Sequence, residues 1–161
     1  MRIDRIVVNA SPLIALFRSG QDDLLPRLFT EVFVPDAVWF EVVAPGRDDA
    51  AATGLASRSW VIRCAADPAP GVGEWNLGAG ETSVLSYALA KPPIRAVVDD
   101  ADARRCCRTL GIPMLGTGGI LLLAKRRGIL PSVETGLEGL RAAGLWLSDE
   151  VVTMLKRQAG E

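Results

Sequence analysis

The chain has 161 residues, of which 49% are hydrophobic and 23% are charged, values typical of one globular domain with a single core. Its formal net charge of −1 argues against a protein that holds nucleic acid through a global positive field, so any basic binding surface must be local. The lack of histidine excludes Ser-His-Asp and Cys-His catalysis, which leaves carboxylates, lysines and metal ions for any chemistry.

The sequence shows no pattern of a membrane span, a signal peptide or a disulfide framework. No segment approaches the roughly 20 apolar residues that a membrane span needs, and the opening sequence MRIDRIVV lacks the length and the small-residue cleavage site of a signal peptide. We therefore expect a cytoplasmic protein with no membrane partner. Cys64, Cys106 and Cys107 are odd in number and show no CxxC spacing, which argues against a disulfide framework or a zinc site.

Short apolar runs alternate with helical stretches along the chain, which is typical of parallel βαβ units. The runs predicted to be strands are residues 6–8, 32–34, 60–62, 96–98 and 114–115. Ser11-Pro12 supplies a capping hydroxyl followed by a proline at the first helical position, which marks a helix start directly after the first strand. The pattern predicts an α/β fold, a three-layer α/β/α sandwich with a central parallel sheet.

Two later segments complete this expected organisation. Residues 66–80, ADPAPGVGEWNLGAG, form a long Gly/Pro-rich connection, and such a connection in a compact domain is often functional or mobile. From about residue 131 the chain has the pattern of two amphipathic helices, PSVETGLEGLRAAG and SDEVVTMLKRQAG, broken at Gly144. We expect residues 1–161 to form one domain on which these C-terminal helices pack.

Several acidic residues occupy positions that admit a structural or a functional interpretation. Glu41 is the lone charged residue in the apolar run that ends VPDAVWFEVV. A carboxylate there needs a partner, a metal, or a position on the solvent-exposed edge of its helix. Glu81 opens a helix after GAG, where the helix dipole by itself favours a negative charge. Asp99 and Asp100 follow an apolar strand, and helix capping alone would explain Asp99. Taken singly, each acid has a sufficient structural explanation.

The positions in combination favour a site. Asn9 and Asp99 follow the C-terminal ends of predicted strands, and ligands bind at such ends in open parallel sheets, at the point where the strand order reverses. If the two strands are neighbours, several carboxylates converge on one edge, and their mutual repulsion requires a counter-ion. Oxygen ligands without histidine or thiolate indicate Mg²⁺ or Mn²⁺.

Five stretches carry a family resemblance. They are VNASPLIALF, LLPRLFTEVFVPDAVWFEVV, LGAGETSVLSYALA, VVDDADARRCCRTLGIPMLGTGGILLLAKRRGILPSV and LRAAGLWLSDEVV. Together they cover nearly the whole chain and resemble, in order, the PIN-domain superfamily and its VapC-like prokaryotic branch. The resemblance implies a Mg²⁺- or Mn²⁺-dependent ribonuclease, often the toxin of a toxin–antitoxin pair. It also implies RNA as the substrate, an antitoxin protein as a partner, and a homodimer.

The resemblance assigns the acids of the family's site to positions in this chain. The first acid falls on Asn9, the second on Glu41, the third on Glu81 and the last on Asp99, with Asp100 beside it as an auxiliary ligand. It thus implies catalytic roles for Glu41, Glu81 and Asp99. The implied metal ligands are Asn9, Glu81, Asp99 and Asp100.

Four further residues are predicted to bind the substrate. Ser11 follows the first acid in the family's pattern, and Thr117, in LGTGGIL, matches a hydroxyl often seen near the site. Arg104 and Arg108 lie at positions i and i+4 of the helix expected after Asp100, so they share one face that can contact an RNA backbone. A solvated helix face explains these two arginines equally well.

Asn9 departs from the family's pattern and leaves alternatives open. Its amide oxygen can coordinate Mg²⁺ but brings no negative charge, so the cation should bind more weakly and catalysis should be weakened. The alternative is a catalytically silent PIN-fold module that binds nucleic acid or protein. A phosphate-receiving domain of the response-regulator type shares the topology, but it needs an acidic pair where this chain has Asn9 and Ala10.

Overall fold

The computed structural model describes residues 5–161, which form a parallel sheet in the order β3-β2-β1-β4-β5. The strands are β1 (Arg5–Val8), β2 (Glu31–Pro35), β3 (Val61–Cys64), β4 (Arg95–Val97) and β5 (Met114–Leu115). The predicted α/β fold is confirmed, and only β3 starts and ends later than its apolar run suggested. Residues 1–4, part of the segment searched for a signal peptide, lie outside the described residues.

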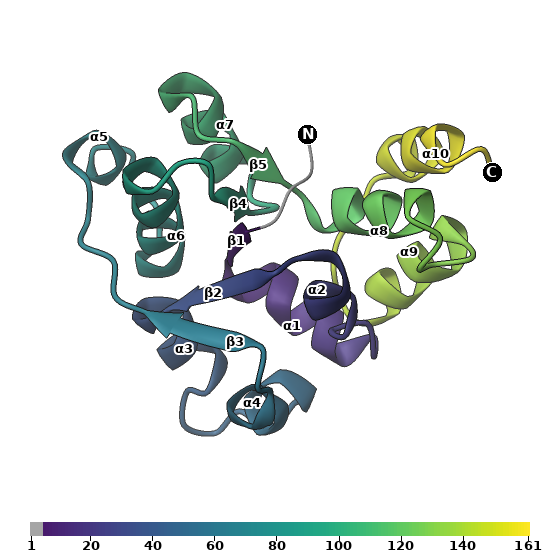
Figure 1. The fold of residues 1–161 in the computed structure, drawn as a ribbon, viewed down its shortest axis with the longest axis horizontal. Coiled ribbons are helices and arrows are strands. Elements are labelled where there is room, and N and C mark those ends of the chain that lie inside the picture. The colour runs from purple at the N-terminus through teal and green to yellow at the C-terminus, as the bar shows by residue number, and fades with distance from the viewer. Residues whose placement is uncertain (1–4) are drawn as a thin grey trace.

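The helices connect the strands in the right order for βαβ units. They are α1 (Ala10–Arg18), α2 (Leu24–Leu28), α3 (Asp36–Val42), α4 (Ala50–Gly54), the 3₁₀ helix η1 (Leu55–Ser57), α5 (Pro70–Gly73), α6 (Ala79–Ala90), α7 (Ala101–Leu110), α8 (Thr117–Arg126), α9 (Val133–Ala142) and α10 (Asp149–Gln158). Helices α6 and α7 lie on one side of the sheet, and α1, α2, α8 and α9 lie on the other, which gives three layers (Figure 1). The Gly/Pro-rich connection expected at residues 66–80 contains α5 and the start of α6.

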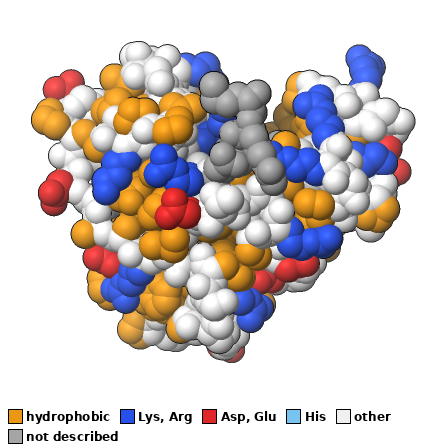
Figure 2. Space-filling model, viewed as in Figure 1, with side chains coloured by type: hydrophobic (Ala, Val, Ile, Leu, Met, Phe, Trp, Pro, Cys, Tyr) orange, Lys and Arg blue, Asp and Glu red, His pale blue; other side chains and the backbone are white. Residues whose placement is uncertain are grey.

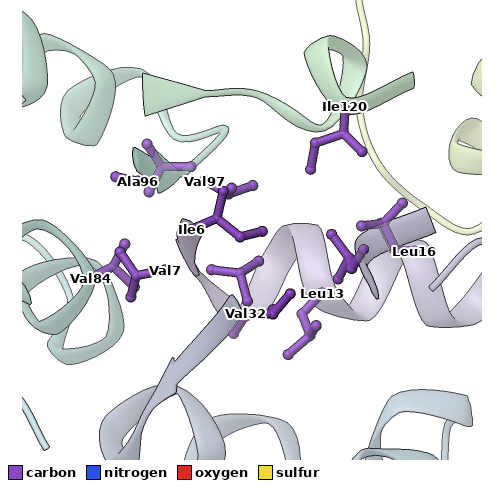
Figure 3. Close-up of a cluster of buried hydrophobic side chains, with 14 of the residues drawn as sticks. Ile6, Val7, Leu13, Leu16, Val32, Val84, Ala96, Val97 and Ile120 are labelled. Atoms are coloured by element: carbon purple, nitrogen blue, oxygen red, sulfur yellow. The ribbon is translucent and has the colours of Figure 1, made fainter. Parts of the chain in front are cut away.

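The centre of the core is β1, which is buried on both faces. Because side chains alternate along a strand, Ile6 and Val7 point to opposite layers, and both are fully buried. Val7 lies beside Val84 of α6, whereas Ile6 points toward the side where Leu16 and Ile120 lie (Figure 3). Full burial of an aliphatic side chain of this size contributes about 1.5–3 kcal/mol. This explains why the strand is continuously apolar and does not alternate with polar residues.

The strand order reverses at β1 and thereby leaves a crevice. From β1 the chain first moves to β2 on one side, and it returns later to β4 on the other side. The backbone N–H of Asn9 donates to the carbonyl oxygen of Val97 at 3.1 Å, so the first residue beyond β1 is tied to β4. The crevice therefore opens at the carboxyl edge of the sheet, where α/β proteins bind their ligands.

The C-terminal helices pack on the α1 side of the molecule. Helix α9 contacts α8 and α1, and α10 contacts α8 and α9. A Cβ atom added to Gly118 would lie 2.5 Å from Cδ1 of Leu155, so α10 approaches the bare backbone of α8. One domain over residues 1–161 stays a prediction. None of the helices formed by residues 5–161 is long and apolar enough to cross a membrane.

The side chain of Glu161 connects the end of α10 to the start of α9. Its carboxylate accepts hydrogen bonds from the backbone N–H groups of Val133 (2.7 Å) and Glu134 (3.1 Å) and from the hydroxyl of Ser132 (3.0 Å). Lys125 approaches it to 3.5 Å. These donors lower the pKa of Glu161 from 4.5 to about 2, and the backbone N–H of Val133 has the largest effect. The contact stabilises the folded protein when this carboxyl is ionised.

We predict that Glu161→Gln lowers the melting temperature at neutral pH. Because the folded-state pKa lies below the unfolded value, the stabilisation is fully present above pH 4.5 and is lost as the pH falls toward 2. Thermal unfolding followed by circular dichroism should therefore show a gap between wild type and variant that closes with acidification. The control is Glu138→Gln, because Glu138 is an exposed residue of α9. The same pH dependence for both variants would contradict the assignment.

Candidate functional site

A cleft of about 510 Å³ opens at the carboxyl edge of the sheet. Its lining includes Asn9, Glu41, Glu81, Asp99 and Asp100, which come from four separate places in the fold or its connections. Asn9 joins β1 to α1, Glu41 is in α3, and Glu81 is in the first turn of α6. Asp99 and Asp100 lie between β4 and α7. The structure thus brings the predicted catalytic and metal-ligating residues to one cleft, and their roles stay predictions.

Asn9 is the buried polar residue of the cleft. It is only 3% exposed, and its Oδ1 atom has no hydrogen-bond partner among the described residues. Although Asn9 occupies the N-cap position of α1, its side chain makes no capping hydrogen bond. A buried acceptor without a donor costs about 1–3 kcal/mol. This oxygen is therefore free to accept a hydrogen bond or to coordinate a cation.

Gly80 allows two of the predicted ligands to approach the same place. A Cβ atom added to Gly80 would lie 2.9 Å from Oε2 of Glu41 and 3.0 Å from Oδ1 of Asn9. The oxygens of α3 and of the β1–α1 junction therefore both rest against the backbone of α6. Any side chain at Gly80 would occupy the space that these oxygens share.

The carboxylate of Asp99 is held in one orientation by Thr117. Its Oδ1 accepts from the backbone N–H of Thr117 at 2.8 Å, and its Oδ2 accepts from the hydroxyl of Thr117 at 2.5 Å. Asp100, and not Asp99, caps α7 by accepting from the N–H of Ala103 at 2.9 Å. The structural explanation for Asp99 as an N-cap is therefore wrong. A carboxylate has about four acceptor sites, so Asp99 retains capacity for a ligand.

The predicted substrate-binding residues fall into different environments. Ser11 is exposed and lines the cleft. Thr117 is fully buried, so its hydroxyl positions Asp99 and offers no surface to a substrate. Arg104 turns back toward the sheet, where its Nη1 donates to the carbonyl of Val98 at 3.2 Å. Arg108 is exposed and is not among the residues that line the cleft. Equal spacing on one helix thus does not give the two arginines equal surroundings.

The electrostatics of the cleft disfavour additional negative charge. Partial burial, followed by the negative charge of Glu81, raises the pKa of Glu41, and the charge of Arg47 opposes this shift. Ionised Glu41 is therefore less favourable in the folded protein than in the unfolded chain. A bound cation would relieve this repulsion.

The donor set fits a hard cation that keeps part of its water. Within residues 5–161, no group of three or more His, Cys, Asp or Glu side chains is close enough to hold a metal between them. Mg²⁺, however, usually retains several waters and binds through one or two carboxylates. An unpartnered amide oxygen at Asn9 and oxygen donors at Glu81 and Asp99 meet that requirement. They do not meet the requirements of zinc, which prefers nitrogen and sulfur ligands.

Sequence reasoning did not identify Arg18 as a cleft residue. The guanidinium of Arg18 lines the cleft, donates to the carbonyl of Ala143 at 3.5 Å and lies 3.6 Å from a carboxylate oxygen of Asp49. Ser11, Ile14 and Arg18 repeat at intervals of three and four residues along α1, and all three line the cleft. This helical spacing from the predicted site was a signal that could have found Arg18.

Strand-end acids in a crevice at the reversal of a parallel sheet define a class of α/β proteins with an oxygen-ligand site. A family model described as PIN domain matches residues 5–161, which is nearly the whole chain. The chain therefore belongs to the PIN-domain family. PIN domains generally use divalent metal ions and commonly bind nucleic acid. No curated protein matches the chain at a significant level.

We predict that Gly80→Ala destabilises the protein and weakens Mn²⁺ binding. Alanine ordinarily stabilises a helix relative to glycine by about 1 kcal/mol, but here its Cβ would lie 2.9 Å from an oxygen of Glu41 and 3.0 Å from an oxygen of Asn9, and the buried Asn9 has little room to move. Overpacking of this kind costs about 1–3 kcal/mol. Urea unfolding and Mn²⁺ titration measure the two effects. Gly73→Ala is the matched control, since nothing lies within 4 Å of its added Cβ. Equal stability of the two variants would refute the close approach.

We also predict that Thr117→Val lowers the free energy of unfolding by about 1–3 kcal/mol, because it removes a hydroxyl donor from the Asp99 carboxylate while keeping the side-chain shape. Thr117→Ser keeps the donor and should lose less. Thr109→Val, at an exposed position of α7, should change stability by less than about 0.5 kcal/mol. Chemical denaturation checks the series, and a loss at Thr117 no larger than at Thr109 would show that the hydroxyl does not hold Asp99.

Proposed function

We propose that this protein is a Mg²⁺- or Mn²⁺-dependent endoribonuclease of the VapC-like type, the toxin half of a toxin–antitoxin pair. The observation that carries the proposal is the buried, unpartnered oxygen of Asn9 in a cleft that Glu81 and Asp99 also line. Membership of the PIN-domain family supports the nuclease class. The absence of histidine excludes an imidazole general base, which agrees with chemistry based on carboxylates and a cation.

Different residues of the cleft would have different roles in phosphodiester hydrolysis. Asn9, Glu81, Asp99 and Asp100 would hold the cation, and Thr117 would keep the Asp99 carboxylate in place. When bound, the cation supplies positive charge to the phosphoryl group and lowers the pKa of water.

Two other residues act on the substrate side of the proposed reaction. Glu41 lines the cleft beside the proposed ligands, so its carboxylate would orient the attacking water. Ser11 lies at the N-terminal end of α1, where backbone N–H groups and the helix dipole favour a phosphate. Both side chains line the same cleft as the proposed ligands.

The partners of the protein are part of the same proposal. Large hydrophobic side chains that are exposed among residues 5–161 and do not line the cleft support a homodimer and an antitoxin partner, and they include Ile62, Leu89, Val151 and Met154. Figure 2 shows hydrophobic side chains on one face with Lys and Arg dispersed among them. This distribution agrees with the net charge of −1 and with RNA binding through local contacts.

We predict that Asn9→Asp tightens Mn²⁺ binding on the order of tenfold and raises cleavage of single-stranded RNA, because it adds the charge that the cation lacks. The same change should lower the melting temperature in the presence of a chelator, since another acid then faces Glu81 and Asp99. Asp99→Asn should weaken Mn²⁺ binding at least about tenfold and abolish cleavage. Calorimetric titration with Mn²⁺ and a gel assay with labelled RNA measure these effects.

The control for both substitutions is Asp102→Asn. Asp102 is an exposed acid of α7 that pairs with Arg105 and is not among the cleft residues, so its loss should change neither metal binding nor cleavage. Equal Mn²⁺ affinity for wild type and Asn9→Asp would mean that Asn9 does not face the cation. Metal binding without cleavage in all variants would favour the silent binding module instead.

A further inference from the structure

Trp146 is an exposed aromatic residue at the rim of the acidic cleft. Its side chain is 83% exposed, although burial of an indole ring is strongly favourable. It belongs to the connection between α9 and α10, and it lines the cleft together with Asp99 and Asn9. An aromatic side chain kept in solvent beside a functional cleft is available to a ligand.

The backbone on both sides of Trp146 is fixed. The N–H of Leu145 donates to the carbonyl of Leu140 at 3.0 Å, and Nη2 of Arg141 donates to the carbonyl of Leu147 at 2.8 Å. Leu145 and Leu147 themselves pack against the hydrophobic core. The two leucines thus anchor the connection and leave Trp146 directed outward on a held backbone, which lowers the entropic cost of binding a flat ligand.

Trp146 stands where a polar and an apolar space meet. The acidic cleft lies on one side, and on the other lies a groove of about 410 Å³ whose lining includes Leu122, Val151 and Met154. Both spaces also share Asp99. A ligand that spans this junction needs a charged part and a flat apolar part.

Arg18 adds a positive charge close to Trp146. Its guanidinium lines the acidic cleft and contacts the carbonyl of Ala143, three residues before the tryptophan. A Cβ atom added to Gly144 would lie 4.0 Å from Nη1 of Arg18. The rim therefore combines an aromatic face with a cation, which is the arrangement that binds the base and the phosphate of one nucleotide.

We propose that Trp146 is a stacking platform for an unpaired base of the RNA strand, next to the phosphate held at the acidic cleft and Arg18. This inference rests on the proposed ribonuclease function, which it deepens by naming the side chain that would hold a base of the RNA strand. Bases in a duplex are covered by their neighbours, so only an unpaired base presents its face to an indole ring. A protein helix would instead bury its apolar side in the groove of Val151 and Met154, and it would not need the acidic cleft.

The test measures binding of a short fluorescein-labelled oligoadenylate with phosphorothioate linkages, which resist hydrolysis, by fluorescence anisotropy in the presence of Mn²⁺. Trp146→Ala should raise the Kd about tenfold, and Trp146→Phe should retain most of the affinity. Stacking involves no counter-ion, so the slope of log Kd against log salt concentration should be unchanged in Trp146→Ala. Arg18→Ala should reduce that slope by about 0.7.

A second strand, with abasic nucleotides in place of adenosines, separates base stacking from other effects. Wild type and Trp146→Ala should bind this strand equally. Phe40→Ala is the control, since Phe40 is another exposed aromatic (61%) that is not among the cleft residues, and it should bind both strands as wild type does.

The outcomes discriminate between the two proposals. If wild type cleaves RNA but Trp146→Ala binds oligoadenylate as tightly as wild type does, the stacking platform is overturned and the ribonuclease stands. A loss of affinity that is equal for the abasic strand also overturns it, because the base is then not the contact. If wild type neither binds oligoadenylate nor cleaves RNA, both proposals fail. Unchanged RNA binding with loss of a protein partner in Trp146→Ala would assign the residue to protein docking.

Discussion

The rest of the structure depends on the pairing of β1 with β4, the point at which the strand order of the sheet reverses. The hydrogen bond from the N–H of Asn9 to Val97 extends this pairing one residue beyond β1. Because the crossover helices leave in opposite directions from this point, neither covers the carboxyl edge between the two strands. The residues that follow the strands therefore face a crevice. Asn9, Asp99 and Asp100 reach their positions through this topological constraint, whereas Glu81 comes from the first turn of α6.

The convergence of acidic side chains on one cleft causes electrostatic repulsion between them, and the uncharged amide of Asn9 keeps this repulsion lower than a further acid would. Glu41, Glu81 and Asp99 line one cleft, and the repulsion between the first two contributes to the raised pKa of Glu41. An amide in place of a further acid lowers this repulsion in the metal-free protein, but it leaves an acceptor buried without a donor. Compared with an acid at the same position, the amide at the end of β1 thus makes the metal-free protein more stable and lowers its affinity for a cation. In the proposed enzyme, this balance limits how tightly the cation is held.

The connection between the C-terminal helices α9 and α10 contributes one wall of the cleft. Helix α10 approaches α8 at Gly118, and Glu161 joins its end to the start of α9. These contacts hold the connection between the two helices at the rim, where Trp146 lies beside residues from the N-terminal part of the chain. The cleft is therefore assembled from both ends of the sequence. Its geometry depends on contacts remote from the acids.

The sequence by itself determined the parallel α/β sheet and the strand-end positions of Asn9 and Asp99, because short apolar runs, turns and helix starts are local patterns. The sequence also singled out Glu41 and Glu81 as acids with a structural or a functional explanation, and the family resemblance assigned them to the site. The sequence did not reveal that Thr117 is buried against Asp99, that Arg104 turns back to Val98, or that Asp100 takes the capping role expected of Asp99. It also did not reveal the space that Gly80 leaves for two oxygens, nor the approach of Arg18 to the connection that carries Trp146. Most of these features join residues far apart in the chain, and all of them depend on where a side chain points, so only the tertiary structure decided them.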